Sequence, residues 1–155
     1  MPRVHILERH QRVPLPIDQA FAFHGDAHNL ERITPPWLEF EVITPRPIEM
    51  GPGTLLDYRL KLHRVPVRWQ TRIETWEPPL RFTDTQLRGP YSLWEHTHTF
   101  EADGPEATIV EDRIRYSIPF GPLGEAANRL LVRRDLQRIF DYRHAAVERE
   151  LGLQH

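Results

Sequence analysis

The sequence predicts an α+β protein in which one antiparallel sheet of about seven strands is followed by a single long C-terminal helix. Three observations support this fold class. Apolar and polar residues alternate through most of residues 38–118, as they do in strands that bury one face. Apolar residues recur every three or four positions over residues 123–151, which is typical of an amphipathic helix. Short apolar runs between Pro16 and Leu30 indicate two short helices after the first strand.

The N-terminal quarter is expected to hold that first strand and the two short helices. Residues 3–13 alternate, with Val4 and Ile6 on one side of the strand. Pro16 suits a first helical turn, where the backbone donor that proline lacks would be unpaired anyway. A second helix is expected near residues 26–30. The Ile-Thr-Pro-Pro-Trp segment that follows ends it, because proline restricts the residue before it.

The remaining strands and the long helix follow in order along the chain. The expected strands cover residues 38–44, 54–62, 67–76, 81–87, 92–102 and 107–118. Turn residues separate them, including Met-Gly-Pro-Gly at 50–53 and the pair Pro78-Pro79. The periodic face of the expected helix consists of Val132, Leu136, Ile139, Phe140, Arg143, Val147 and Leu151. We expect the helix to pack against the sheet through this face.

Composition limits the classes of function. The length suits one domain over residues 1–155, and 39% hydrophobic with 27% charged residues is typical of a globular chain. The net charge is −2 and the basic residues are dispersed, so no nucleic-acid partner is expected. The absence of cysteine excludes disulfides, thiol catalysis and thiolate metal sites. No apolar run is long enough for an integral membrane segment, and we expect a cytoplasmic location.

The most distinctive chemistry lies in the segment Trp-Glu-His-Thr-His-Thr-Phe at residues 94–100. In a strand, alternate side chains point the same way, so His96 and His98 share a face with Trp94 and Phe100. Imidazoles on an apolar face are costly unless they find hydrogen-bond partners, water or a ligand.

Carboxylates on the neighbouring strands are the expected partners of these imidazoles. The register of the first hairpin places Asp84 opposite His96, and that of the second places Asp112 opposite His96 or His98. At least one histidine should therefore bond to an aspartate. The polar groups expected on this inner face are Asp84, Gln86, His96, His98, Asp112 and Tyr116.

Arg143 adds a charge in the middle of the helix's apolar face. A charge in that position needs a partner, and an inner aspartate is the expected one. We favour a buried polar network that ties helix to sheet over direct catalysis. The other histidines show no pattern and are interpreted as surface residues: His5, His10, His24, His28, His63, His144 and His155.

Two sharper interpretations of the histidine pair stay open. His-x-His on a strand can bind zinc or iron with a third ligand from Asp84 or Asp112. The spacing only superficially matches the cupin pattern, so no bound metal and no cofactor are expected. Alternatively, a histidine paired with an aspartate could act as a general base while Arg143 holds an enolate. No nucleophile elbow, phosphate loop or dinucleotide fingerprint accompanies these residues.

The sequence resembles the START-like, or SRPBCC, superfamily in its bacterial branch of polyketide cyclase/dehydrase and lipid-transport type. The resemblance rests on residues 29–42, residues 67–100, Ile-Pro-Phe-Gly-Pro-Leu-Gly at 118–124 and Arg-Ile-Phe-Asp-Tyr-Arg at 138–143. It implies a helix-grip fold, in which a curved sheet wraps around the C-terminal helix and leaves a ligand cavity between them.

The resemblance also implies a function. We expect binding of a small, mostly hydrophobic lipid, polyketide or quinone-like molecule in that cavity, with a cyclase, dehydratase or hydrolase activity as the alternative. The sequence leaves the question of protein partners open. The expected ligand-binding residues are Trp37, Tyr58, Trp69, Asp84, Gln86, Trp94, His96, His98, Asp112, Tyr116, Phe140 and Arg143.

Overall fold

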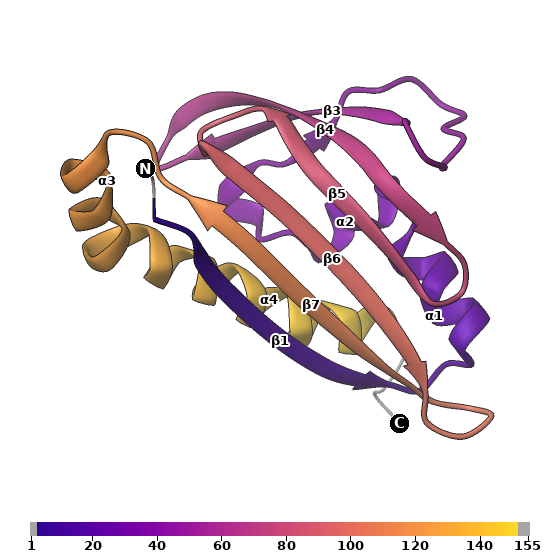
Figure 1. Cartoon of the computed structure of the whole chain (residues 1–155). Coiled ribbons are helices and arrows are strands. Elements are labelled where there is room, and N and C mark those ends of the chain that lie inside the picture. Colours follow the sequence, from indigo (N-terminus) through magenta and orange to yellow (C-terminus); the bar gives the residue numbers. More distant parts are fainter. Residues whose placement is uncertain (1–2, 152–155) are drawn as a thin grey trace.

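One seven-stranded antiparallel sheet curves around the C-terminal helix in the computed structural model, which describes residues 3–151 (Figure 1). The order across the sheet is β1-β7-β6-β5-β4-β3-β2, so the first strand pairs with the last. The strands are β1 His5–Val13, β2 Glu41–Val42, β3 Leu55–Leu62, β4 Val65–Glu77, β5 Arg81–Arg88, β6 Leu93–Ala102 and β7 Thr108–Ser117. This arrangement confirms the predicted fold class.

The helices occupy two parts of the chain. The longest, α4, lies across the concave side of the sheet, and α1 and α2 close one end (Figure 1). The helical segments are α1 Ile17–His24, α2 Ala27–Ile33, the 3₁₀ turn η1 Pro36–Leu38, α3 Gly121–Ala127, the π-helical turn η2 Asn128–Val132 and α4 Arg133–Glu150. No helix within residues 3–151 is both long and apolar enough to cross a membrane.

The expected strand at residues 38–44 is mostly wrong. Only Glu41–Val42 pairs with β3, because Pro36 starts a 3₁₀ turn that runs to Leu38. A left-handed residue, Glu39, then redirects the chain. The alternation of apolar residues still predicted the inward side of this segment, because the Phe40 ring packs 4.8 Å from the buried Tyr58 ring.

The two hairpins around β6 set the register of the inner face. Phe82 pairs with His98 and Asp84 with His96, as the sequence predicted. In the second hairpin His98 pairs with Asp112, which resolves the choice left open by the sequence. Both histidine side chains are consequently buried.

The C-terminal helix packs on the sheet through the predicted periodic face. Leu136, Phe140 and Val147 are buried against it. The helix begins at Gly121 rather than residue 123, and a π-helical turn interrupts it at Asn128. The buried Asn128 side chain accepts a hydrogen bond of 2.9 Å from the Tyr116 hydroxyl, which joins this turn to β7.

Candidate ligand-binding site

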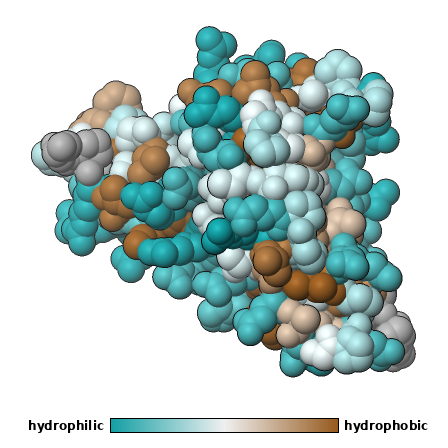
Figure 2. Space-filling model, turned by 45° about the vertical axis from the view of Figure 1, so that its right-hand side comes forward, coloured by the Kyte–Doolittle hydropathy of each residue, from teal (hydrophilic) through white to brown (hydrophobic). Residues whose placement is uncertain are grey.

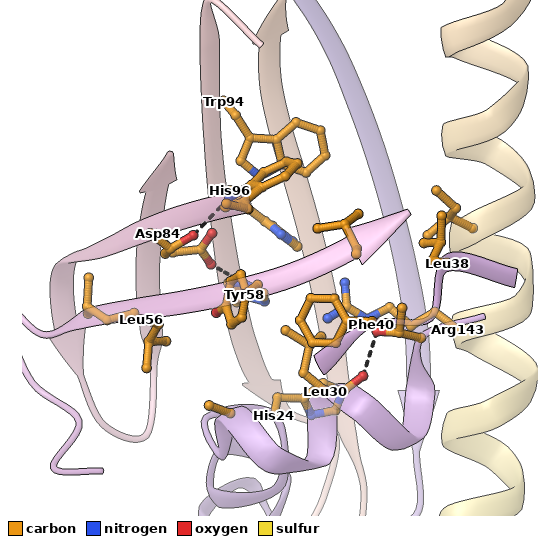
Figure 3. A pocket seen from close by; sticks show the side chains of 18 of the residues that line it. His24, Leu30, Leu38, Phe40, Leu56, Tyr58, Asp84, Trp94, His96 and Arg143 are labelled. Carbon is orange, nitrogen blue, oxygen red and sulfur yellow. Dashed lines mark hydrogen bonds and ion pairs between the residues drawn. The ribbon is translucent and has the colours of Figure 1, made fainter. Parts of the chain in front are cut away.

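A cavity of about 170 Å³ lies between the concave side of the sheet and α4. This volume is roughly ten times what one water molecule requires by the same measure. Most of its wall is hydrocarbon, and the close-up in Figure 3 shows side chains from the sheet, the short helices and α4 converging on it. The apolar lining includes Leu30, Leu38, Phe40, Leu56, Leu60, Ile73, Phe82, Trp94, Leu136, Ile139 and Phe140.

The polar part of the wall is built from the two histidines and Asp84. His96 Nε2 donates to Asp112 Oδ1 at 2.8 Å, and His98 Nε2 donates to Asp84 Oδ2 at 2.9 Å. Each hydrogen bond therefore runs diagonally, to the aspartate opposite the other histidine. The two imidazole rings stack at 3.7 Å, and Phe82 covers His98 at 4.0 Å. Packing and hydrogen bonds together fix both rings in place.

The charges in this network follow from its hydrogen bonds. Burial alone would lower the pKa of His98, but Asp112 and Asp84 outweigh it and raise that pKa above its usual value. Burial and the nearby His98 instead lower the pKa of His96. Burial disfavours both carboxylates, yet the histidines lower the pKa of Asp84 and hold that of Asp112 well below its usual range. One imidazolium, on His98, between two carboxylates fits these directions.

His24 also lines the cavity, which corrects its interpretation as a surface residue. It ends α1, and its Nδ1 donates to the Ala20 carbonyl at 2.9 Å. Burial lowers the pKa of His24 to about 4, so the ring is neutral near pH 7. With Nδ1 carrying the proton, Nε2 remains as a hydrogen-bond acceptor. Its spacing from the buried Ala20 and Phe21 was the sequence signal for an inward position.

The expected ion pair of Arg143 is wrong. Arg143 points from α4 toward the cavity (Figure 3), yet it forms no ion pair or hydrogen bond with any residue in the described part of the chain. Asp84 is near enough for Arg143 to favour its charged form, but its carboxylate is bonded to His98. The sequence correctly placed Arg143 on the inner face but could not show that the histidines would engage both aspartates.

Eight of the twelve expected ligand-binding residues line the cavity. They are Tyr58, Trp69, Asp84, Trp94, His96, His98, Phe140 and Arg143. Burial raises the pKa of Tyr58, so its hydroxyl stays protonated. The indole N–H of Trp69 donates to Thr71 Oγ1 at 3.0 Å and is therefore already satisfied.

The other four expected residues lie outside the cavity lining. Trp37 is 48% exposed and its ring packs against the half-buried ring of Tyr142 on α4. Gln86 bonds the backbone of Tyr91 and closes the β5–β6 turn. Asp112 lies behind the histidines, and the Tyr116 hydroxyl turns toward the π-helical turn.

Several lining residues were not predicted. Leu30 follows the buried Ala27 by one helical turn, and Phe40 alternates with the buried Val42, so both carried a periodic signal. Tyr91 lies in the β5–β6 turn and packs 4.8 Å from Trp94. No local pattern distinguishes an inward aromatic residue in a turn from an exposed one. Of the remaining predicted surface histidines, His155 lies outside the described residues.

Asp84, His96 and His98 could also hold a metal ion. One ligand atom from each lies within 4.8 Å of the others, and imidazole with carboxylate suits zinc or iron. Both Nε2 atoms already donate protons to carboxylates, so a metal would have to bind at an Nδ1 atom or displace one of those protons. The absence of a bound metal stays a prediction, which elemental analysis of the purified protein tests.

The family comparison agrees with this architecture. Residues 13–141 match the model of a family described as polyketide cyclase/dehydrase and lipid transport. The chain belongs to this polyketide cyclase family. No curated protein sequence matches the chain.

Solved structures with the same fold include both enzymes and proteins without a stated activity. An aromatase/cyclase from a Streptomyces species has a TM-score of 0.77 at 17% identity, over 97% of this chain and 94% of that one. Truncated norcoclaurine synthase from Thalictrum flavum has a TM-score of 0.69 at 15% identity, over 99% and 96%. A START superfamily protein from Mycobacterium smegmatis has a TM-score of 0.66 at 12% identity, over 94% and 98%. At these identities the likeness concerns the fold of the polyketide cyclase family alone.

Proposed function

We propose that this protein binds a small, mostly apolar molecule in the cavity between the sheet and α4. The observation that carries the proposal is the cavity itself, with an apolar lining and a few polar groups gathered on one wall. Ligand sites have this composition because apolar area supplies affinity while a few polar groups orient the ligand. The resemblance to binders in the same superfamily supports this choice.

The energetics of the cavity wall support occupancy. Side chains such as Leu56 and Ile73 are nearly inaccessible from outside and belong to an apolar cluster, yet part of their surface also borders the cavity. Atoms at an empty cavity lack the dispersion contacts that a close-packed interior provides. An apolar ligand would restore those contacts and remove its own apolar area from water.

Native mass spectrometry of freshly purified protein tests the proposal. We expect a co-purifying apolar molecule, or uptake of naphthalene as a small probe. Ile139→Trp fills the cavity from α4 and should abolish uptake, whereas Glu148→Trp on the exposed side of the same helix should not. Equal uptake by the wild type and Ile139→Trp would refute the proposal.

A second candidate is chemistry on the bound ligand, of the cyclase or dehydratase kind. It is favoured by His96, His98 and Asp84 on the cavity wall, since an imidazole paired with a carboxylate can transfer protons. Ligand turnover that is lost in His96→Asn while binding persists would support it. Binding without product formation would leave carriage as the function.

A further inference from the structure

Arg143 is the cavity residue whose chemistry the rest of the structure does not use. It follows Phe140 by three positions and precedes Val147 by four, so α4 carries it on the face that packs inward. Its guanidinium carbon lies 5.4 Å from the centre of the Phe140 ring. By contrast, Arg9 pairs with Asp141 on the outside of the same helix.

The guanidinium has no hydrogen-bond partner among residues 3–151. Guanidinium presents five N–H donors and keeps its proton at any physiological pH. Arg143 is half-buried, and in a cavity walled by Leu30, Leu38 and Phe40 its donors need water or a ligand as partners. A helix position that retains such a charge suggests that its partner is a molecule supplied from outside the chain.

The surrounding groups indicate what kind of partner these donors can take. Asp84 and Asp112 with the His98 imidazolium between them carry one net negative charge, but both carboxylates are bonded to histidines and give Arg143 no hydrogen bond. His24 is neutral and the Tyr58 hydroxyl stays protonated, so neither is an anionic partner. The planar fork of unfilled donors, rather than an excess of charge, therefore selects the ligand group, and a planar carboxylate fits it.

We propose that Arg143 binds the carboxylate of an amphiphilic acid whose aromatic or aliphatic body fills the apolar part of the cavity. Planar guanidinium and carboxylate groups fit as a bidentate pair, which is shorter and stronger than a neutral hydrogen bond. This inference rests on the proposed function, because it names the class of ligand that the same cavity takes.

The test compares two probes that differ only in charge. Titration calorimetry measures the binding of 2-naphthoate and of the neutral 2-naphthamide to the wild type, Arg143→Met and Arg134→Met. We expect the wild type to prefer 2-naphthoate by tenfold or more, and Arg143→Met to lose that preference while still binding the amide. Arg134 is exposed on α4, so Arg134→Met should retain the preference. Thermal unfolding establishes that each variant is folded.

The outcomes separate this inference from the proposed function. If the wild type binds both probes equally, or if Arg143→Met keeps the preference, the carboxylate site is wrong and the apolar cavity still stands. If the wild type binds neither probe nor naphthalene, the proposed function fails and this inference fails with it. Arg143→Lys adds a second check, since it keeps the charge but loses the planar fork and should retain only part of the preference.

Discussion

The stacked imidazoles of His96 and His98 show how single residues make a polar wall inside an apolar cavity. Each ring has a carboxylate for its Nε2 proton, and His98 Nδ1 lies 3.3 Å from the same Asp112 oxygen that His96 reaches. Asp112 thus serves both rings. Removing one of these residues leaves a buried donor or acceptor of its neighbours unpaired. The free energy cost of such an unpaired group exceeds the net free energy that one hydrogen bond contributes to folding.

His96→Ala should lower the free energy of unfolding by about 1–3 kcal/mol, because Asp112 then loses its shorter and stronger hydrogen bond and keeps only the longer contact with His98. His10→Ala is the matched control, since His10 is exposed on β1. Urea unfolding of both variants measures the difference. A His96→Ala protein as stable as the control would mean that the network contributes nothing to folding. The variant's affinity for naphthalene then shows whether the ring also contacts the ligand.

His24 predicts a pH dependence of stability. Its pKa is about 4 in the folded protein and near 6.5 when unfolded, so the unfolded chain binds more protons between these values. Its contribution to stability is therefore complete above pH 6.5 and is lost as the pH falls toward 4. His24→Gln should flatten the curve of unfolding free energy against pH in this window, and His10→Gln should not. Parallel curves for the wild type and His24→Gln would contradict the assigned burial.

At the scale of elements, two antiparallel hairpins bring together groups that are distant in sequence. β6 lies between β5 and β7, so its histidines reach carboxylates on both sides. The β3–β4 turn is shorter than the turns of these two hairpins, because only His63 and Arg64 separate the strands. His63 and Arg64 both adopt left-handed conformations there, as a two-residue hairpin with right-handed strand twist requires. α4 then places Arg143 across the cavity from this sheet.

The junction between β7 and α3 leaves no room for a side chain at position 124. Gly124 is buried, and a Cβ atom at this position would lie 2.0 Å from the Pro119 carbonyl oxygen. Gly124→Ala should therefore destabilise the protein by about 1–3 kcal/mol, because backbone must move to admit the methyl group. Gly51→Ala is the control, since a Cβ there meets nothing within 4 Å. Similar melting temperatures for the two variants would show that the backbone at this junction shifts at little cost in stability.

At the scale of the whole molecule, the fold is a layer of sheet and a layer of helix that do not close completely. Figure 2 shows a largely hydrophilic exterior on the face in view, with hydrophobic residues in separate patches. The cavity lies between the two layers, and the aromatic side chains of Phe82, Trp69 and Tyr91 are part of its lining.

Occupancy of the cavity should be visible in global stability. A ligand that binds only the folded state stabilises it by about 2.7 kcal/mol at a hundred times its Kd. Wild-type protein with 2-naphthoate at that concentration should melt at a higher temperature than without it, and Ile139→Trp should show no increase. An equal shift in both proteins would mean that the probe binds somewhere other than the cavity.

The sequence by itself determined most of the elements and their faces. Period-two and period-3.6 patterns are local consequences of backbone geometry, so the meander, the long helix and the inward position of His96 and His98 were readable from them. The hairpin parity also predicted which strands would supply carboxylates. A one-residue error would have reversed every face, and the observed register shows none.

Only the tertiary structure decided how those groups share partners. Diagonal hydrogen bonding in the histidine network depends on side-chain rotamers and ring stacking, which residue order does not encode. As a result, Asp84 and Asp112 both bond to histidines, and Arg143 has no ion pair within residues 3–151. The inward position of Tyr91 likewise depends on how the β5–β6 turn packs over the cavity. Contacts between distant segments are set by the packing of the whole chain, and the cavity's chemistry arises at that level.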